Sequence, residues 1–587
     1  MEKVNEYLTS LFDEEPKEEI LNVTEYPNCF ELPISYLKDK YELADNIYTD
    51  LELIEQKDGS NCLYDCVFEN DNILGKQLLK KWSKYYTTNE TFLKDSQKLY
   101  ESIDIDIVND NKKTDTIYNN YLNKLNDNNF KSNFDYIEWK YLNFLNQSTF
   151  VLQTLCIYNM TSPVISLVMP IIMLLVPFLI LKLQGIPINV KEYSTILEKL
   201  IQNDVIGKML RLHTMPLKQA IYTICSFGFY LFSLYQNINH CYRFNNNLYL
   251  VNNTLIELRE YNNVTIKNME NIIKSTENLK TYSKFNETLL EKMLLLKELN
   301  NDLIYITPYE LNPYKLIDIG YVLQVFYRIF QDKETTELLM YSFGFNGYIC
   351  NILDIKMNID QSFINKSKFN KNKISFTNSY YAPLKKSCIK NTYSVNKNML
   401  ITGPNAAGKT TLLKSTMFNL ILIQQIGYGF FSKSNVCLHN YFHCYLNIPD
   451  TSGRDSLFQA EARRCKEILD LITNKTHEKH FCIFDELYSG TNPYEAVASA
   501  YAYLLYIIEN HKNFRFMITT HYLDLCKKLK SKVKNTHMEV LTNDKNFEYT
   551  YLVKNGTSSV KGGLKVLKDL NYPELITEKA EKLLYKL

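Results

Sequence analysis

The chain has 587 residues, 45% of them hydrophobic and 22% charged, and its formal net charge is +1. This length is too great for one hydrophobic core, so we expect about two to four domains. A nearly neutral chain excludes a globally basic nucleic-acid-binding protein, so any DNA contact must come from local patches. The 13 cysteines form no C-x-x-C pair, and the first residues are too charged for a secretory signal. Both features predict an intracellular protein.

Two apolar segments stand out in the first half of the chain. Residues 163–181 read PVISLVMPIIMLLVPFLIL, and residues 220–235 read AIYTICSFGFYLFSLY. The first is long enough to cross a bilayer, and the second is marginal. The loop 182–218 carries six Lys/Arg against three Asp/Glu, and in a spanning hairpin with a cytosolic body it would face outward, against the positive-inside rule. Two interpretations stay open: a membrane hairpin, or a pair of buried helices.

The most specific motif in the chain is ITGPNAAGKTT. It fits G-x-x-x-x-G-K-[ST], in which two glycines let backbone N–H groups wrap around phosphates. Residues 398–401 predict a buried strand before it, and 411–426 predict a helix after it. The Lys409 ammonium would reach the β- and γ-phosphates, and the Thr410 hydroxyl would ligate Mg²⁺. The expected nucleotide-binding residues are Gly403, Pro404, Asn405, Ala406, Ala407, Gly408, Lys409, Thr410 and Thr411.

Two further apolar strands follow this loop in the sequence. FCIFDE is typical of a buried parallel strand, and it ends in Asp485 and Glu486. Asp485 would hold Mg²⁺, and Glu486 would orient or deprotonate an attacking water. FRFMITTHY ends near His521, a residue that could sense a γ-phosphate. Between the loop and the first of these strands, Ser456 begins an amphipathic helix, either as an N-cap or as a group that meets an anion.

A zinc site in CLHNYFHC is not expected. Its candidate ligands would be Cys437, His439, His443 and Cys444. On a strand, the alternation of side chains places the first three on one face and Cys444 on the other. One strand therefore closes a tetrahedral site poorly.

In their order and spacing, TGPNAAGKTT, DSLFQAE, FDELYSGTN and TTHY resemble the MutS family of ABC-type ATPases. The resemblance implies an α/β ABC-type P-loop ATPase domain in the C-terminal half and a mainly α-helical core and lever region in the N-terminal half. It makes Ser456 the signature serine that reaches the partner's nucleotide across a dimer interface. It makes Asp485 the Walker B aspartate, Glu486 the catalytic base and His521 the switch histidine. It also implies ATP and Mg²⁺ as cofactors and a homodimer formed through the ATPase domain.

The resemblance also suggests a division of the chain. TDLELIE, near residue 49, is similar to the start of the family's core domain, which leaves no room upstream for the mismatch-recognition and connector domains. The region 240–304 would form the levers, 337–358 the helix that leads into the ATPase domain, and 363–374 a polar connecting loop. The expected parts are an N-terminal extension (1–45), the core and lever region (46–345), a connector (346–375), the ATPase domain (376–555) and a dimerising helix–turn–helix (556–587).

Some positions depart from the commonest family pattern. Ala406 and Ala407 stand where Met-Gly is usual, and LYSGTNP after Glu486 lacks the Arg of mismatch-repair members. An aromatic residue that stacks on adenine is expected upstream of the loop. The corresponding residues 388–391 read CIKN and offer no ring.

The resemblance predicts a DNA-dependent ATPase, an ATP-driven dimeric clamp that acts on DNA in mismatch repair or recombination. The alternative is a membrane-associated ATPase of the same family that organises protein or DNA at a membrane without mismatch recognition. Either protein would be intracellular, in the cytoplasm or the nucleus, and the second would be attached to a membrane.

Overall fold

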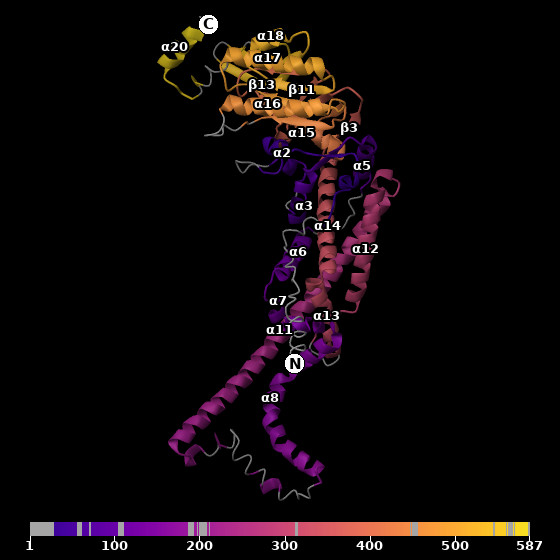
Figure 1. Cartoon of the computed structure of the whole chain (residues 1–587), viewed down its shortest axis with the longest axis vertical. Helices are drawn as coiled ribbons and strands as arrows, with labels where there is room; N and C mark the ends of the chain where they lie inside the picture. Colours follow the sequence, from indigo (N-terminus) through magenta and orange to yellow (C-terminus); the bar gives the residue numbers. More distant parts are fainter. Residues whose placement is uncertain are drawn as a thin grey trace, which may run out of the picture. The chain divides into compact units, whose positions relative to one another are not determined.

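The structure is a computed structural model of the chain (Figure 1). Its described residues form two compact units, each assembled from segments that are distant in the sequence. Unit 1 contains the described residues within 116–267 and 293–339, and unit 2 contains those within 24–115, 268–292 and 340–587. The structure describes residues 29–584 except 56–61, 70–71, 104–110, 186–192, 196–197, 199–207, 210–211, 311–314, 447, 449–455, 544–545, 559, 561–566 and 569.

Unit 1 is built from helices around a cluster of aromatic rings. Phe326 lies 4.9 Å from Phe134 and 4.8 Å from Phe330, measured between ring centroids. Helix α8 lies close to α13: the backbone N–H of Gly320 on α13 donates to Gln153 Oε1 on α8 at 2.7 Å. The elements with residues in this unit are α6 (Asn111–Leu125), α7 (Phe130–Asn133), η4 (Lys140–Gln147), α8 (Thr149–Leu183), η5 (Leu212–Thr214), α11 (Leu217–Thr276), α12 (Ser283–Ile304), α13 (Lys315–Gln331) and α14 (Lys333–Asp360).

The two apolar segments of the sequence lie in α8 and α11. Their large apolar side chains are exposed: Val164 on α8 is 61% exposed and Phe229 on α11 is 74% exposed. Among the described residues, the stretch Thr149–Met169 has the length and composition of a membrane-spanning helix, and little of it is buried. Core helices of soluble proteins can share this length and apolar composition, so the two properties are weak evidence for a membrane-spanning helix. The long helices expected over 240–304 are α11 and α12.

The N-terminal part of unit 2 packs against α15. The Tyr64 hydroxyl donates to Gln425 Oε1 at 2.7 Å, and Gln425 Nε2 donates to the Trp82 carbonyl at 2.7 Å. The buried side-chain amide of Gln425 thus holds two parts of the N-terminal segment, one at Tyr64 and one at Trp82, against α15. The elements of that segment are η2 (Pro33–Tyr36), β1 (Lys40–Glu42), α2 (Asp45–Asp50), η3 (Tyr64–Cys66), α3 (Ile73–Gln77), α4 (Leu79–Trp82), β2 (Tyr85–Thr87) and α5 (Glu90–Ser102), and β1 pairs with β2.

The main sheet of unit 2 has six strands. In spatial order they are β13 (Asn546–Asn555), β12 (Lys534–Asn543), β6 (Met399–Thr402), β11 (Phe514–Thr519), β10 (His480–Asp485) and β9 (Tyr441–Tyr445). All neighbours are parallel except the β12–β13 pair. The apolar runs predicted as strands form β6, β10 and β11, and these strands are buried, as a parallel sheet covered on both faces requires. The carboxyl ends of the parallel strands meet at one edge.

Helices cover this sheet and complete its core, in the orange and yellow part of Figure 1. One apolar cluster joins Ile468, Leu504 and Leu525, from three different helices, to Phe484 and Phe516 of the sheet. The helices are α15 (Lys409–Ile426), α16 (Leu457–Asn474), α17 (Pro493–Asn510) and α18 (Leu523–Lys528). The expected α/β architecture of the C-terminal half and the helical character of the N-terminal half are therefore confirmed.

A second sheet has five strands, in the order β5 (Asn391–Ser394), β4 (Ser375–Ser379), β8 (Lys433–Val436), β3 (Asn365–Phe369) and β7 (Tyr428–Gly429). The polar loop expected over 363–374 is therefore wrong for the residues of β3. That strand is polar because only Ser367 at its centre is buried, while its backbone pairs with β7 and β8. The expected helix over 337–358 is α14.

Helix α20 (Glu574–Leu584) lies in the predicted helix–turn–helix. Residues 559, 561–566 and 569 before it lie outside the described residues, as do residues 1–28 of the predicted N-terminal extension. The domain boundaries predicted from the sequence stay predictions.

Candidate functional site

The loop between β6 and α15 lies at the carboxyl edge of the sheet. It turns through backbone conformations that favour glycine, with φ of 153° at Gly403 and 88° at Gly408. Ala406 also has a positive φ, of 63°. Gly408 is the N-cap of α15, so the N–H groups of the first helical turn have no partner within the helix. This arrangement suits an anion, because free N–H groups and the helix dipole act together there.

Three neighbouring elements place oxygen atoms around Asp485, the last residue of β10. The Thr410 hydroxyl on α15 donates to Asp485 Oδ2 at 2.8 Å. The Thr519 hydroxyl on β11 donates to Asp485 Oδ1. These neutral hydroxyls and the carboxylate form a group of hard oxygen donors, which is the kind of ligand that Mg²⁺ prefers.

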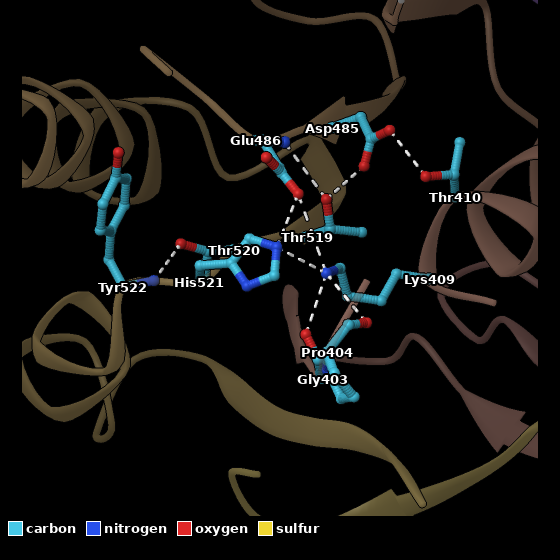
Figure 2. A network of polar contacts seen from close by, with 10 residues as sticks. All are labelled: Gly403, Pro404, Lys409, Thr410, Asp485, Glu486, Thr519, Thr520, His521 and Tyr522. Carbon is cyan, nitrogen blue, oxygen red and sulfur yellow. Dashed lines mark hydrogen bonds and ion pairs between the residues drawn. The ribbon is translucent and has the colours of Figure 1, made fainter. Parts of the chain in front are cut away.

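Lys409, Glu486 and His521 converge beside this carboxylate, and Figure 2 shows the His521 ring between the other two side chains. His521 Nε2 lies 2.9 Å from Glu486 Oε1 and 2.8 Å from Lys409 Nζ. Lys409 Nζ also donates to the Gly403 carbonyl at 2.9 Å. One ring nitrogen carries at most one proton. It can therefore donate to Glu486 or accept from Lys409, and the two bonds exclude each other.

The protonation equilibria of this group follow from its contacts. The hydrogen bond from His521 lowers the pKa of Glu486, and the Lys409 charge acts in the same direction against the opposing effect of burial. Burial lowers the pKa of Lys409, while the charges of Glu486 and Asp485 oppose that shift. Glu486 is therefore held ionised, which is the form that can accept a proton.

The backbone at Glu486 is held in an uncommon conformation. Its φ is 52°, in the left-handed region that residues other than glycine rarely adopt. Its N–H donates to the Thr519 hydroxyl at 3.2 Å. The same threonine thus contacts Asp485 and the backbone of Glu486, so it fixes both carboxylates relative to β11.

Ser456 lies at the start of α16, apart from the cluster in this chain. Its hydroxyl accepts from the Gln459 N–H, and the Gln459 side chain accepts from the Ser456 N–H at 2.9 Å, which forms a capping box. The prediction that Ser456 could be the N-cap of this helix is therefore confirmed. Residues 453–455, which precede it, lie outside the described residues.

Glu461, on the same helix, is a site residue that sequence reasoning missed. It is 3% exposed, and its carboxylate accepts from the Ser489 N–H at 3.0 Å, the Ser489 hydroxyl at 2.9 Å and the Gly490 N–H at 3.1 Å. Glu461 thereby ties the helix that begins at Ser456 to the loop that follows Glu486. Only its place in the motif DSLFQAE could have drawn attention to it.

A cavity of about 600 Å³ opens beside the loop. Lys409, Thr410 and Glu486 line it, together with apolar and aromatic side chains that sequence reasoning did not select: Tyr380, Leu384, Ile389, Met538 and Tyr551. Residues 388–391 offer no ring for the adenine, and the sequence leaves the stacking residue unidentified. The structure brings rings from other segments to the cavity.

Tyr551 reaches the loop because Asn391 anchors its strand. Asn391 Nδ2 donates to the Tyr551 carbonyl at 2.9 Å, and Asn391 Oδ1 accepts from the Val553 N–H at 2.8 Å. As a result the Tyr551 ring lies against the loop, 3.1 Å from where a Cβ on Gly408 would be. No local pattern near residue 551 signals this contact, since its partners are far away in the sequence.

Among the residues considered as zinc ligands, Cys437 Sγ lies 3.5 Å from His439 Nε2, whereas His443 Nε2 lies 3.0 Å from Nδ1 of His480, which is not one of them. Burial lowers the pKa of both His439 and His443 to about 3, so both rings are neutral. Across the part of the chain that the structure describes, no group of three or more His, Cys, Asp or Glu side chains is placed to hold a metal ion.

Comparison with known proteins places the C-terminal third in a defined class. A family model described as MutS domain V matches residues 399–587. The DNA mismatch repair protein MutS of Persephonella marina is 28% identical over 204 residues, which cover 34% of this chain and 23% of that protein. Its namesake in Aquifex pyrophilus is 30% identical over 193 residues, 32% of this chain and 22% of that protein. The matched stretch thus spans less than a quarter of the length of these relatives.

MutS domain V is an ATPase-type domain, and this class agrees with the parallel sheet and the loop described above. Residues 399–587 of this chain therefore match MutS domain V, and the chain is similar to MutS proteins over about a third of its length.

Proposed function

We propose that the chain is a MutS-like, DNA-dependent ATPase with an ABC-type P-loop domain, which works as an ATP-driven dimeric clamp on DNA in mismatch repair or recombination. One observation carries the proposal: Lys409, Thr410, Asp485, Glu486 and His521 come from three elements and meet at one edge of the sheet. The names of its relatives support a role on DNA.

In this proposal the loop 403–411 holds the phosphates of ATP. The N–H groups at the start of α15 and the Lys409 ammonium bind the β- and γ-phosphates, so Lys409 exchanges its present acceptors for phosphate oxygens. Thr410 and Asp485 would hold Mg²⁺, which supplies positive charge to the phosphates when bound. The hydrogen bond of 2.8 Å between their side chains supports this assignment, because it brings the two oxygens together.

Glu486 is the base of the reaction. The oxygen of a water forms a bond to the γ-phosphorus, the bond from that phosphorus to the oxygen of ADP breaks, and the water proton passes to Glu486. His521 orients Glu486 through the hydrogen bond of Nε2, which Lys409 leaves free for Glu486 once it has turned to the γ-phosphate. Because Nε2 serves only one partner at a time, ATP binding would decide which bond His521 makes.

The apolar and aromatic lining of the cavity would take the adenine. Tyr551, Ile389 and Leu384 belong to this lining, and each is partly exposed. Aromatic and apolar side chains of this kind suit the flat face of a base. Tyr551 therefore takes the stacking role for which residues 388–391 offer no ring.

Hydrolysis would require two chains. Ser456 is exposed at the N-terminus of α16 and does not belong to the cluster around Lys409 in its own chain. In a homodimer joined through the ATPase domains, the Ser456 of each chain would meet the γ-phosphate held by the other. ATP would then hold the two protomers together, and hydrolysis would release them.

The exchange Glu486→Gln tests this assignment, because it keeps the size of the side chain and removes the base. We expect turnover to fall by roughly 100-fold or more, while ATP still binds and holds two chains together as a dimer. Single-turnover hydrolysis and size-exclusion chromatography with ATP measure both effects. The matched control is Glu495→Gln, an exposed glutamate at the start of α17. A Glu486→Gln protein that turns over at the native rate would remove Glu486 as the base.

A second candidate function, a membrane-associated ATPase of the same family, is favoured by the pair α8 and α11. Asn237 Nδ2 donates to Ser166 Oγ at 2.6 Å and the Tyr230 hydroxyl to the Ser166 carbonyl at 3.4 Å, so polar groups join the two helices. Phe229 and Phe232, in contrast, are exposed. Polar contacts inside and apolar side chains outside are typical of helices in lipid.

Flotation with phosphatidylcholine–phosphatidylglycerol vesicles separates the two candidates. If α8 and α11 enter the lipid, the intact chain floats, and the double exchange Phe229→Gln with Phe232→Gln reduces the floating fraction. Tyr494→Gln, at an exposed ring in unit 2, is the control. A chain that stays at the bottom of the gradient would contradict membrane association.

A further inference from the structure

A second cavity lies at the edge of the main sheet opposite the candidate nucleotide site. Its residues come from the end of α17, the loops that enter β6, β11 and β12, and the start of β11, whereas the loop 403–408, Glu486 and His521 lie near the ends of their strands. Since β6 is parallel to β11 and to β12, the starts of these strands meet at one edge and their ends at the other. The cavity measures about 320 Å³ and is separate from the one beside Lys409.

Positive charge gathers around this cavity. Four cationic side chains line it, namely Lys397, Lys512, Arg515 and Lys532, and none of its described lining residues is acidic. Lys532 pairs with Glu509. The other three cations have no ion pair among the described residues. Like charges that converge without counter-charges repel one another, so such a cluster is stabilised when an anion binds.

His511 supplies an unused donor at the same place. It is 8% exposed, it lines the cavity, and neither of its ring nitrogens has a hydrogen-bond partner among the described residues. A buried N–H group without an acceptor is unfavourable, so most such groups are paired. A phosphate oxygen in the cavity would accept from this ring and would lie among the cations.

We propose that this cavity is a binding site for a phosphate group, separate from the proposed ATPase centre. Arg515 offers a guanidinium fork, which matches phosphate geometry in two parallel hydrogen bonds, and Lys397 and Lys512 supply point charges. A cavity of this volume takes a small phosphorylated ligand or one backbone phosphate of a nucleic acid. It is too small for a duplex.

The test uses the full-length chain with Lys409→Ala, so that the proposed nucleotide site does not compete for the probe. Inorganic pyrophosphate is titrated calorimetrically at low salt. The double exchange Lys397→Gln with Arg515→Gln should weaken its binding by roughly 10- to 100-fold. The control Lys527→Gln with Lys530→Gln removes the same charge from exposed positions outside the cavity and should leave the affinity unchanged.

A labelled single strand and a labelled duplex form the second arm. Loss of both DNA and pyrophosphate binding in the double variant assigns the site to backbone phosphate, and loss of pyrophosphate binding alone assigns it to a free anion. Absence of pyrophosphate binding, or equal affinity in the double variant and the control, would overturn the proposal. Lys397→Gln alone, at an exposed side chain, carries the test if the double variant does not fold.

Discussion

At the scale of single residues, Lys409 is the buried cation on which nucleotide binding depends. Its ammonium has carbonyl, imidazole and carboxylate neighbours in the structure, and phosphate oxygens would replace them. The exchange Lys409→Ala removes charge-assisted hydrogen bonds, so ATP affinity should fall by roughly 10- to 100-fold. Calorimetric titration with ATP measures the change. Lys527→Ala, at an exposed lysine, is the control, and an unchanged affinity in Lys409→Ala would mean that the loop is not the site.

His521 controls the acid limb of the predicted pH–rate profile. Its hydrogen bond lowers the pKa of Glu486, so the base stays ionised down to a more acidic pH than an ordinary glutamate. In His521→Ala the pKa of Glu486 rises, and the rate is lost at a higher pH as the solution is acidified. The rate constant kcat measured across the acidic range tests this shift, with His477→Ala at an exposed turn as the control. An acid limb in the same place in both proteins would contradict the role of His521.

The residues that sequence reasoning found and missed differ in one physical respect. Lys409, Asp485 and His521 lie at or a few residues beyond the carboxyl ends of buried strands, within short contiguous sequence motifs that can be recognised. Tyr551 and Glu461 act through partners elsewhere in the fold, such as the Asn391 amide and the Gly490 N–H. Contacts of that kind depend on the tertiary arrangement, which no local spacing encodes.

At the scale of elements, Ser456 combines two roles that substitution can separate. Ser456→Ala removes the cap of α16 and should lower the free energy of unfolding by about 1 kcal/mol. Asparagine is an equally good N-cap, so Ser456→Asn should restore stability. If the hydroxyl also meets the partner's nucleotide, both variants lose ATPase activity. Urea denaturation and a steady-state ATPase assay measure the two effects, and native turnover in Ser456→Asn would leave capping as the whole role.

Apolar strands were easier to predict than polar ones. β6, β10 and β11 lie within continuous apolar runs, because they are buried on both faces of the sheet. β3 lies in a segment expected to be a loop, because its pairing uses backbone groups while most of its side chains face solvent. The sequence pattern reports burial, and a strand with little burial gives a weak signal.

At the scale of the whole molecule, the domains predicted from the sequence are consecutive ranges, whereas each compact unit of the structure combines separate segments of the chain. Residues 24–115 and 268–292 belong with 340–587 in unit 2. The bonds of Gln425 to Tyr64 and Trp82 are examples of the contacts responsible. Such pairs join residues hundreds of positions apart, so the division of the chain into units could not be read from composition or local pattern.

The central claim is that this chain couples ATP hydrolysis to DNA. The most direct measurement is the steady-state ATPase rate of the purified chain without DNA and with duplex, mismatched or branched DNA, at one fixed low salt concentration, because DNA binding depends strongly on salt. We expect that at least one DNA structure raises the rate and that Glu486→Gln removes both the basal and the stimulated activity. A basal rate that no DNA structure changes would contradict the DNA-dependent clamp and favour the membrane-associated alternative.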